Sequence, residues 1–495
     1  MAEQSLKDKT VKGVGWSAID NISSYVVTFV VGIILARLLS PEDYGLIGII
    51  GIFTAICNSC INAGFSSALI RKKIPDENDY CTAYVTNLSV SFFLYAVLFI
   101  SAPLIAIFFD HSELTALIRV DSIGIIIGAF SIVQRVRLTK QIDFKSQTKI
   151  TITASLISSI VGITAAFIGW GVWALVAQHL VSATISMFLL LFFNRWIPKF
   201  RFSKKSFKEM FGYGSNLLLS NLLNTLWTNI YQVVIGKFYA PATLGQYSRA
   251  IGFSSIFSTN LTGVVQRVTF PVLSEIQDDK QRLKEGYKRM IKITMLISFS
   301  SMMLLSSISK SLTIVLVGEK WLQSAYFLQI ICWSSMLYPL HALNLNMLQV
   351  QGRSDLFLKL EIIKKIIGIV PIALGIFIDI YYMLFGSVIM GLLSYYLNAY
   401  YSGPFIGYAM KEQISDISPS FIISLFSAII AFVPSVCIEI FFPECNWNIT
   451  SFIILPIQIL LGLIVLCVCY EFWKLDEYNE LKSIFVSIIK KYKNK

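Results

Sequence analysis

The sequence predicts an all-α polytopic membrane protein of about 14 transmembrane helices, with two six-helix lobes related by an internal repeat and an extra helix pair. Composition is the first observation behind this prediction: of 495 residues, 55% are hydrophobic and 14% are charged. Soluble proteins carry about 25% charged residues, and the mean hydropathy here is +0.68. The spacing of the apolar stretches and a repeated turn are the other two observations.

Apolar stretches recur along the whole chain. A helix that crosses a bilayer needs about 20 predominantly apolar residues. Fourteen stretches meet this requirement, near residues 15–38, 45–69, 82–109, 113–134, 150–168, 172–194, 212–238, 248–272, 290–309, 324–349, 357–379, 381–407, 418–441 and 449–470. Because the number is even, we expect both termini on the same side of the membrane.

The distribution of positive charge predicts which side that is. The formal net charge of +12 would suggest nucleic-acid binding in a soluble protein. If the N-terminus is cytoplasmic, however, all but six of the 41 Lys and Arg residues fall on the cytoplasmic side. Cytoplasmic loops of membrane proteins are enriched in these residues. We therefore expect cytoplasmic termini and no nucleic-acid partner.

One turn between apolar stretches occurs twice. Segment 37–45, Arg-Leu-Leu-Ser-Pro-Glu-Asp-Tyr-Gly, recurs 200 residues later as segment 237–245, Lys-Phe-Tyr-Ala-Pro-Ala-Thr-Leu-Gly, with the cation, proline and glycine at matching positions. Two lobes in the same orientation would bind substrate at their interface and rock against each other. The predicted organisation is an N-lobe at 15–194, a cytoplasmic linker at 195–210, a C-lobe at 211–407, a last helix pair at 418–470 and a cytoplasmic tail at 471–495.

The first copy of this turn carries an acidic pair, Glu42 and Asp43. Ser40 is placed to cap the following helix, and Pro41 suits its first position. Acidic side chains in a first turn are stabilised by the helix dipole. We therefore interpret the pair as part of a helix start, although enzymes acting on polyprenyl substrates also place acidic residues in an early outer loop.

Five segments, in this order along the chain, carry a family resemblance. They are 36–45, Ala-Arg-Leu-Leu-Ser-Pro-Glu-Asp-Tyr-Gly; 169–176, Gly-Trp-Gly-Val-Trp-Ala-Leu-Val; 239–249, Tyr-Ala-Pro-Ala-Thr-Leu-Gly-Gln-Tyr-Ser-Arg; 318–321, Gly-Glu-Lys-Trp; and 351–359, Gln-Gly-Arg-Ser-Asp-Leu-Phe-Leu-Lys. The chain resembles the Wzx-type flippases, the polysaccharide-transporter branch of the multidrug/oligosaccharidyl-lipid/polysaccharide exporter superfamily. The resemblance spans most of the chain.

The resemblance implies a flippase of the bacterial inner membrane rather than an enzyme. Such a protein moves undecaprenyl-pyrophosphate-linked oligosaccharide repeat units from the cytoplasmic to the outer leaflet, for O-antigen, capsule or exopolysaccharide synthesis. The resemblance implies that the protein contacts the polyprenyl-linked glycan and membrane lipids, and that a polysaccharide polymerase and a chain-length regulator are its partners. It implies no cofactor. Two alternatives stay open: a drug/cation antiporter of the same superfamily, and a polyprenyl-dependent membrane glycosyltransferase or polymerase.

Cations and amides on helix 248–272 are the first candidate substrate ligands. Arg249 and Arg267 are about five helical turns apart and share one face with Asn260. An anionic pyrophosphate would need such cations, and a glycan would need such amides. Arg249 stands in an outer half, where the positive-inside pattern supplies no reason for it. Arg267 could equally be an ordinary cytoplasmic flank.

Further candidates lie on neighbouring helices. Asn221 and Asn224 share a face of helix 212–238, where hydrogen bonding between helices is the competing interpretation. Arg119 can reach a neighbouring helix, and an interhelical ion pair is favoured there over substrate contact. Lys237 and Arg37, the cations of the repeated turn, complete the predicted substrate-binding set.

Asp20 is the candidate for ion coupling or gating. A single carboxylate in the first apolar stretch must be protonated, paired or hydrated. Protons, sodium or the membrane potential could each drive transport. We expect His179 and His341 to be hydrogen-bonded packing residues, because their spacing is not that of metal ligands. We therefore predict no metal site, and we name no catalytic residue.

Overall fold

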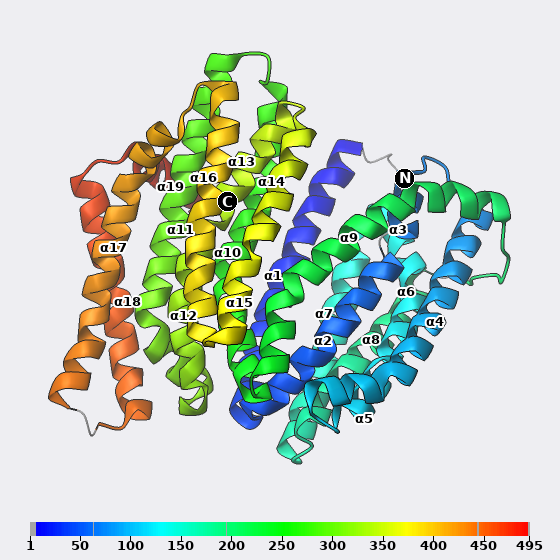
Figure 1. Ribbon diagram of the computed structural model, residues 1–495. Helices are drawn as coiled ribbons and strands as arrows, with labels where there is room; N and C mark the ends of the chain where they lie inside the picture. Colours follow the sequence, from blue (N-terminus) through cyan, green and yellow to red (C-terminus); the bar gives the residue numbers. More distant parts are fainter. Residues whose placement is uncertain (1–5, 63, 195, 443–444, 494–495) are drawn as a thin grey trace. The chain divides into compact units, whose positions relative to one another are not determined.

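The structure is a computed structural model that describes residues 6–62, 64–194, 196–442 and 445–493 (Figure 1). Within these ranges the secondary structure consists of helices, in agreement with the predicted all-α class. The chain forms two compact units, residues 1–245 and 246–495. Each unit is described here by itself.

The N-terminal unit begins with α1, Leu6–Leu38, and contains eight further complete helices. These are α2 Pro41–Asn62, α3 Phe65–Arg71, α4 Glu77–Phe109, α5 Leu114–Asp121, α6 Ile123–Lys140, α7 Phe144–Phe167, α8 Val172–Asn194 and α9 Lys204–Phe238. Helix α7 packs against both α1 and α8, and α6 packs against α4 and α8. Helix α9 packs along α2, α3 and α4, so it belongs to the N-terminal unit.

Helix α10, Pro241–Glu275, crosses the division between the units. The C-terminal unit continues with α11 Lys280–Val317, a 3-10 turn at Glu319–Trp321, α12 Leu322–Ser335, α13 Tyr338–Val350, α14 Ser354–Ile367, α15 Ile369–Phe377, α16 Ile380–Ile406, α17 Met410–Phe441, α18 Trp447–Phe472 and α19 Asp476–Lys493. Helix α11 packs against α12, α17 and α18, while α16 packs against α12, α13 and α15.

All fourteen predicted stretches coincide with helices. Ten coincide with a single helix, and the other four with the pairs α2/α3, α5/α6, α12/α13 and α14/α15. Among the described residues, ten helical segments are long and apolar enough to span a membrane. The chain is therefore a multi-pass membrane protein, and the count of fourteen spans stays a prediction. The six-plus-six repeat also stays a prediction.

The repeated turn starts a helix in both copies. Helix α2 begins at Pro41 and α10 at Pro241. Before α2, the Asp43 backbone N–H donates to the Ser40 hydroxyl (3.2 Å), and the Ser40 N–H donates to the Asp43 carboxylate (2.8 Å). This reciprocal capping box satisfies two backbone donors at the helix start. The predicted role of the acidic pair as part of a helix start is thus confirmed for Asp43.

Candidate functional site

A cavity of about 520 Å³ lies inside the N-terminal unit, lined by α2, α3, α6 and α8. Its walls carry one cation, one imidazole and several small polar groups. Those polar groups include Arg135, His179, Asn58, Ser131, Ser182 and Ser186. Ionisable groups inside a membrane protein are costly to place and mark substrate or ion pathways. This cavity is therefore the candidate functional site.

A contact between two helices, from His179 to Asp121, lies at the wall of the cavity. The Nδ1 atom of His179 on α8 lies 2.8 Å from the Asp121 carboxylate, the last residue of α5. The Asp121 side chain is 3% exposed, whereas that of His179 is 52% exposed. The Asp121 carboxylate is thus buried among the helices. The His179 imidazole, which binds it, is the member of the pair that lines the cavity.

A helix break places Asp121 at this point. The span 114–140 is interrupted at Ser122, between α5 and α6. The Ser122 hydroxyl donates a hydrogen bond to the Ile118 carbonyl oxygen (2.5 Å). Hydroxyl bonds to the preceding turn compete with the helical hydrogen-bond ladder and bend helices. The helix is therefore interrupted at Ser122, directly after the buried Asp121 carboxylate.

Asp20, the predicted coupling residue, lies on α1 next to the bundle of α6 and α7. The charge of Arg135 on α6 and the hydroxyl of Thr151 on α7 both act on its carboxylate. Arg135 also lines the cavity. Arg135 is therefore near enough to act electrostatically on Asp20. The Asp20 Oδ1 atom is buried and accepts no hydrogen bond within the described part of the chain.

Three predicted substrate cations lie elsewhere in this unit. Arg119 Nε donates to the Phe99 carbonyl oxygen (3.2 Å), and its guanidinium lies 4.3 Å from the Phe99 ring centre. The contact is interhelical, but it joins Arg119 to an aromatic ring and a carbonyl rather than to an acid. Lys237 pairs with Asp110 at 2.9 Å. Arg37 is exposed in the last turn of α1.

The predicted residues of α9 and α10 are distributed along their own helices. Asn221 and Asn224 are exposed on α9. On α10, the Asn260 amide donates to the Ile256 carbonyl oxygen (2.9 Å), and Arg267 Nε donates to that of Gly263 (3.1 Å). Arg249 behaves differently, as described next. None of these five side chains lines the cavity between α6 and α8.

Arg249 packs on aromatic rings in the C-terminal unit. Its guanidinium carbon lies 5.2 Å from the ring centre of Trp321 and 6.0 Å from that of Phe253. Trp321 is fully buried. A guanidinium within about 6 Å of an aromatic ring gains a favourable cation–π interaction. The structure thus orients the Arg249 side chain toward a fixed aromatic surface.

Sequence reasoning missed Arg135 and did not assign a site role to His179. Arg135 was counted with the cytoplasmic charges, and His179 was interpreted as a packing residue. His179 does hydrogen-bond, as that interpretation expected, but it also lines the cavity. One signal could have revealed it: His179, Ser182 and Ser186 follow each other at helical spacing on one face.

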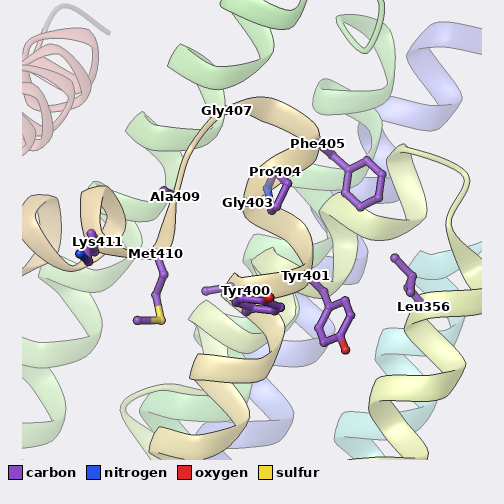
Figure 2. Close-up of a pocket in the computed structure, with 11 residues that line it drawn as sticks. Leu356, Tyr400, Tyr401, Gly403, Pro404, Phe405, Gly407, Ala409, Met410 and Lys411 are labelled. Atoms are coloured by element: carbon purple, nitrogen blue, oxygen red, sulfur yellow. The ribbon is translucent and has the colours of Figure 1, made fainter.

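A second cavity, of about 790 Å³, lies in the C-terminal unit where α16 turns into α17 (Figure 2). Its lining is mainly apolar and aromatic, with Tyr400, Tyr401 and Phe405 on α16 and Lys411 at the start of α17. The Arg353 guanidinium lies 5.4 Å from the Phe405 ring centre. This cavity offers an aromatic surface but no buried charge among its lining residues.

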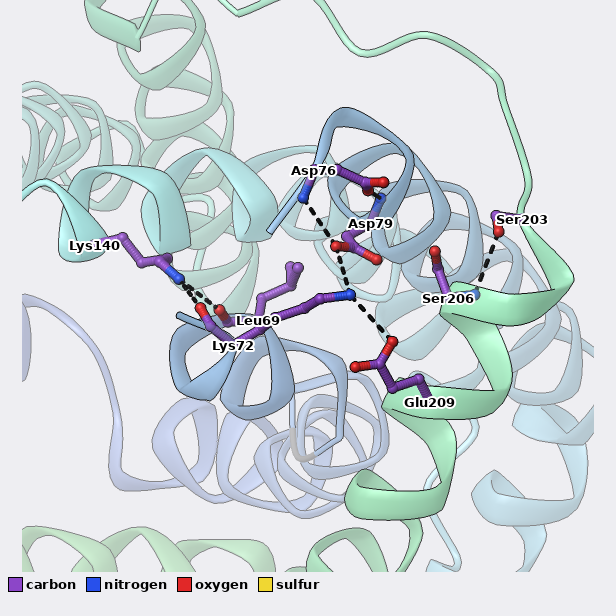
Figure 3. Close-up of polar contacts among 8 residues, drawn as sticks. All are labelled: Leu69, Lys72, Asp76, Asp79, Lys140, Ser203, Ser206 and Glu209. Carbon is purple, nitrogen blue, oxygen red and sulfur yellow. Dashed lines mark hydrogen bonds and ion pairs between the residues drawn. The ribbon is translucent and has the colours of Figure 1, made fainter. Parts of the chain in front are cut away.

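A polar cluster fastens the first turns of α9 to α3 and α4 (Figure 3). Lys72 Nζ lies 2.9 Å from the Asp79 carboxylate of α4 and 3.1 Å from the Glu209 carboxylate of α9. The hydrogen bond to Asp79 raises the pKa of Lys72. Lys140 of α6 donates to the carbonyl oxygens of Leu69 (3.1 Å) and Lys72. Four helices are thereby tied together at one end of the unit.

The fold is that of a multi-pass membrane protein with a cavity that carries charged side chains. Over 94% of this chain and 99% of the other, the structure superposes on the lipid II flippase MurJ in its inward closed conformation, with a TM-score of 0.73 and 16% identity. At this identity the likeness shows the shared fold.

The chain belongs to the polysaccharide biosynthesis protein family, whose model matches residues 34–326. It is similar to the teichuronic acid biosynthesis protein TuaB of Bacillus subtilis, with 26% identity over 71% of this chain and 73% of the relative. It is also similar to the lipopolysaccharide biosynthesis protein WzxC of Escherichia coli, with 23% identity over 88% and 89%. The resemblance seen in the sequence is thereby confirmed.

Proposed function

We propose that this chain moves undecaprenyl-pyrophosphate-linked oligosaccharide repeat units from the cytoplasmic to the outer leaflet of the bacterial inner membrane. The two lobes would alternate access around the substrate, with both chain termini in the cytoplasm. The product would pass to a polysaccharide polymerase and a chain-length regulator. The protein itself acts as a transporter and not as an enzyme.

Two findings together support this proposal: the chain belongs to a family named for polysaccharide biosynthesis, and its fold is that of the lipid II flippase MurJ. A lipid-linked glycan is assembled where its activated sugars are, and it must cross the membrane before it can become surface polymer. A membrane-spanning bundle in such a family therefore fits the crossing step.

The predicted ligands retain their proposed roles in this function. Cations on α10 and at the ends of α1, α5 and α9 would contact the pyrophosphate or acidic sugars, and amides on α9 and α10 would contact neutral sugars. These residues are Arg249, Arg267, Asn260, Asn221, Asn224, Arg119, Lys237 and Arg37. Charge-assisted hydrogen bonds from Arg suit phosphate because the guanidinium binds in a bidentate manner.

The alternatives receive less support from the side chains. For a glycosyltransferase or polymerase the acidic pair Glu42 and Asp43 would be the candidate, but Asp43 accepts hydrogen bonds from both the Ser40 N–H (2.8 Å) and its hydroxyl (2.7 Å), which gives it a role in the helix start. A cationic-drug antiporter would favour an acid without a nearby cation, whereas the charge of Arg135 acts on Asp20.

The experiment is a deletion in the native host followed by leaflet analysis. We expect the deletion to stop surface polymer and to leave the lipid-linked oligosaccharide inaccessible to a membrane-impermeant glycan oxidant in spheroplasts. Plasmid-borne wild type should restore both polymer and outer-leaflet labelling. If the deletion strain lacks the lipid-linked oligosaccharide altogether, the protein acts in its synthesis and the flippase proposal is wrong.

A further inference from the structure

The cavity between α6 and α8 has a polar wall that continues away from the Asp121–His179 pair. Ser182 and Ser186 follow His179 on the same face of α8 and also line the cavity. On the wall formed by α6, Arg135 lies beyond the helix break at Ser122 that separates it from Asp121. The cavity therefore has His179 on the wall formed by α8 and Arg135 on the wall formed by α6, with serine hydroxyls among apolar side chains.

The groups that face His179 can be named from each helix packed against α8. Helix α5 contributes the Asp121 carboxylate, and α6 contributes Arg135 on the shared cavity wall. Helix α2 contributes the neutral Asn58 to the same wall. Helix α7 meets α8 where Gly162 faces the neutral Gln178 side chain. Helix α1, which packs on α7, carries Asp20, and the charge of Arg135 acts on its carboxylate.

This arrangement suits a proton better than a metal cation. The contact between His179 and Asp121 uses an imidazole nitrogen and a carboxylate oxygen at 2.8 Å, which is hydrogen-bond distance. Imidazole changes charge between about pH 5 and 8. Chains of Asp, Glu and His inside membrane bundles serve as proton relays in pumps and transporters. With Nδ1 on the carboxylate, the second ring nitrogen is the position where a proton can enter or leave.

We propose that His179 and Asp121 form a proton-binding site of the N-terminal unit, and that its occupancy drives the transport cycle. This inference rests on the proposed transport function. It assigns the proton as coupling ion and adds an entry site to the predicted residue Asp20.

The charge balance explains how occupancy would act on the helices. With His179 protonated, the imidazolium neutralises the buried carboxylate on α5. When the proton leaves, the pair carries a net negative charge, which attracts Arg135 of α6 across the cavity. Coulomb attraction between unit charges in a bundle interior is worth several kcal/mol at short range and falls with distance. Proton loss therefore changes the net charge that the pair presents to the cavity and to Arg135 of α6.

The first test is a titration of the imidazole itself. The chain has three histidines, so wild type labelled with ¹⁵N-histidine in nanodiscs gives three sets of ring signals, and His179→Gln identifies the signals of His179 by their loss. We expect the ring signals of His179 to change with pH as the imidazole gains and loses its proton, and Asp121→Asn to displace that change. A His179 ring that stays in one state in wild type at every pH at which the protein is folded would overturn the proposal.

The second test measures transport. Surface polymer is quantified in the complemented deletion strain at external pH values from about 5 to 8, normalised to protein abundance. His111→Gln is the matched control, since His111 lies in the connection between α4 and α5. We expect His179→Gln to lower export at least tenfold and to abolish its pH dependence, while His111→Gln matches wild type.

The outcomes separate this inference from the proposed function. Failure of wild type itself to restore outer-leaflet labelling would contradict the flippase function. Restoration by His179→Gln with an unchanged pH profile would overturn the proton site alone. Unfolding of each variant, followed with a thiol-reactive dye on the buried cysteines Cys57 and Cys332, identifies a variant that fails to fold. For such a variant, the titration of His179 in the wild-type protein decides whether the proton site exists.

Discussion

Gly45 lies so close to Pro241 that a Cβ atom on the glycine would sit 1.8 Å from the proline carbonyl oxygen. The contact is reciprocal, because a Cβ on Gly245 would sit 1.9 Å from the carbonyl oxygen of Pro41. The glycine of each repeated turn therefore packs against the proline of the other copy. The first turns of α2 and α10 cross at a backbone distance that only glycine permits.

This crossing predicts that Gly45→Ala is destabilising. The methyl group would overlap backbone atoms that cannot rotate away, and overpacking of this kind costs about 1–3 kcal/mol or more. Gly51→Ala is the matched control on the same helix, since a Cβ there meets nothing within 4 Å. Thermal unfolding in detergent should show a lower midpoint for Gly45→Ala only. Equal midpoints for the two variants would contradict the crossing.

The helices could be predicted well from the sequence, because the thickness of the membrane requires each spanning helix to contain about 20 apolar residues. It also predicted the start of α2, where Ser40, Pro41 and Asp43 each have a local role. The contact between the two turns could not be predicted, because apolar periodicity does not say which helices cross. The repeat nevertheless held the signal, since both glycines occupy the same position in it.

The candidate site was predicted only in part. Asp20 stood out because a carboxylate in an apolar stretch is costly. Arg135 did not, because a cation near a helix end that the sequence predicts to be cytoplasmic has an ordinary topogenic explanation. The Asp121–His179 pair joins residues 58 positions apart, and only the packing of α5 on α8 brings them together.

The Asp20–Arg135 relationship predicts a non-additive pair. Each single substitution, Asp20→Asn or Arg135→Gln, leaves one charge without its counter-charge inside the bundle, so export should fall about tenfold or more. The double variant removes both charges and should export better than either single variant. Export at matched protein abundance measures this coupling. Strictly additive losses would show that the two side chains act independently.

The Lys72 cluster predicts unequal costs for its partners. Lys72→Ala leaves Asp79, whose side chain is 1% exposed, without its cation, which should cost about 1–3 kcal/mol. Glu209→Gln removes a partner that is 56% exposed, and exposed pairs contribute about 0–1 kcal/mol. The unfolding midpoint should therefore fall clearly for Lys72→Ala only. A larger fall for Glu209→Gln would contradict the assigned burial.

Arg249 tests the proposed substrate contacts. A charge-assisted hydrogen bond is worth about 1.5–3 kcal/mol, or roughly ten- to a hundredfold in binding. We expect Arg249→Ala to leave lipid-linked oligosaccharide on the cytoplasmic leaflet at normal protein abundance. Arg249→Lys, which keeps the charge but loses the bidentate guanidinium, should restore export in part. Normal export by Arg249→Ala would leave only the packing on Trp321 as its role.

Reporter fusions test the predicted orientation. A cytoplasmic reporter should be active when fused after Arg71 or Lys205, because both positions lie in segments rich in Lys and Arg. The same reporter fused after His111 should be inactive. Activity after His111 combined with inactivity after Lys205 would reverse the topology and the direction of transport.

Reconstituted flipping tests the central claim most directly. Purified protein is placed in liposomes with fluorescently labelled lipid-linked oligosaccharide extracted from the deletion strain, and an impermeant quencher is added outside. In protein-free liposomes the fluorescence of the inner leaflet is protected, because the impermeant quencher reaches only the outer leaflet. We predict that wild type lowers the protected fraction towards zero and leaves a labelled phospholipid protected. An unchanged protected fraction, in liposomes that contain folded protein, would contradict the assignment of this chain as a lipid-linked oligosaccharide flippase.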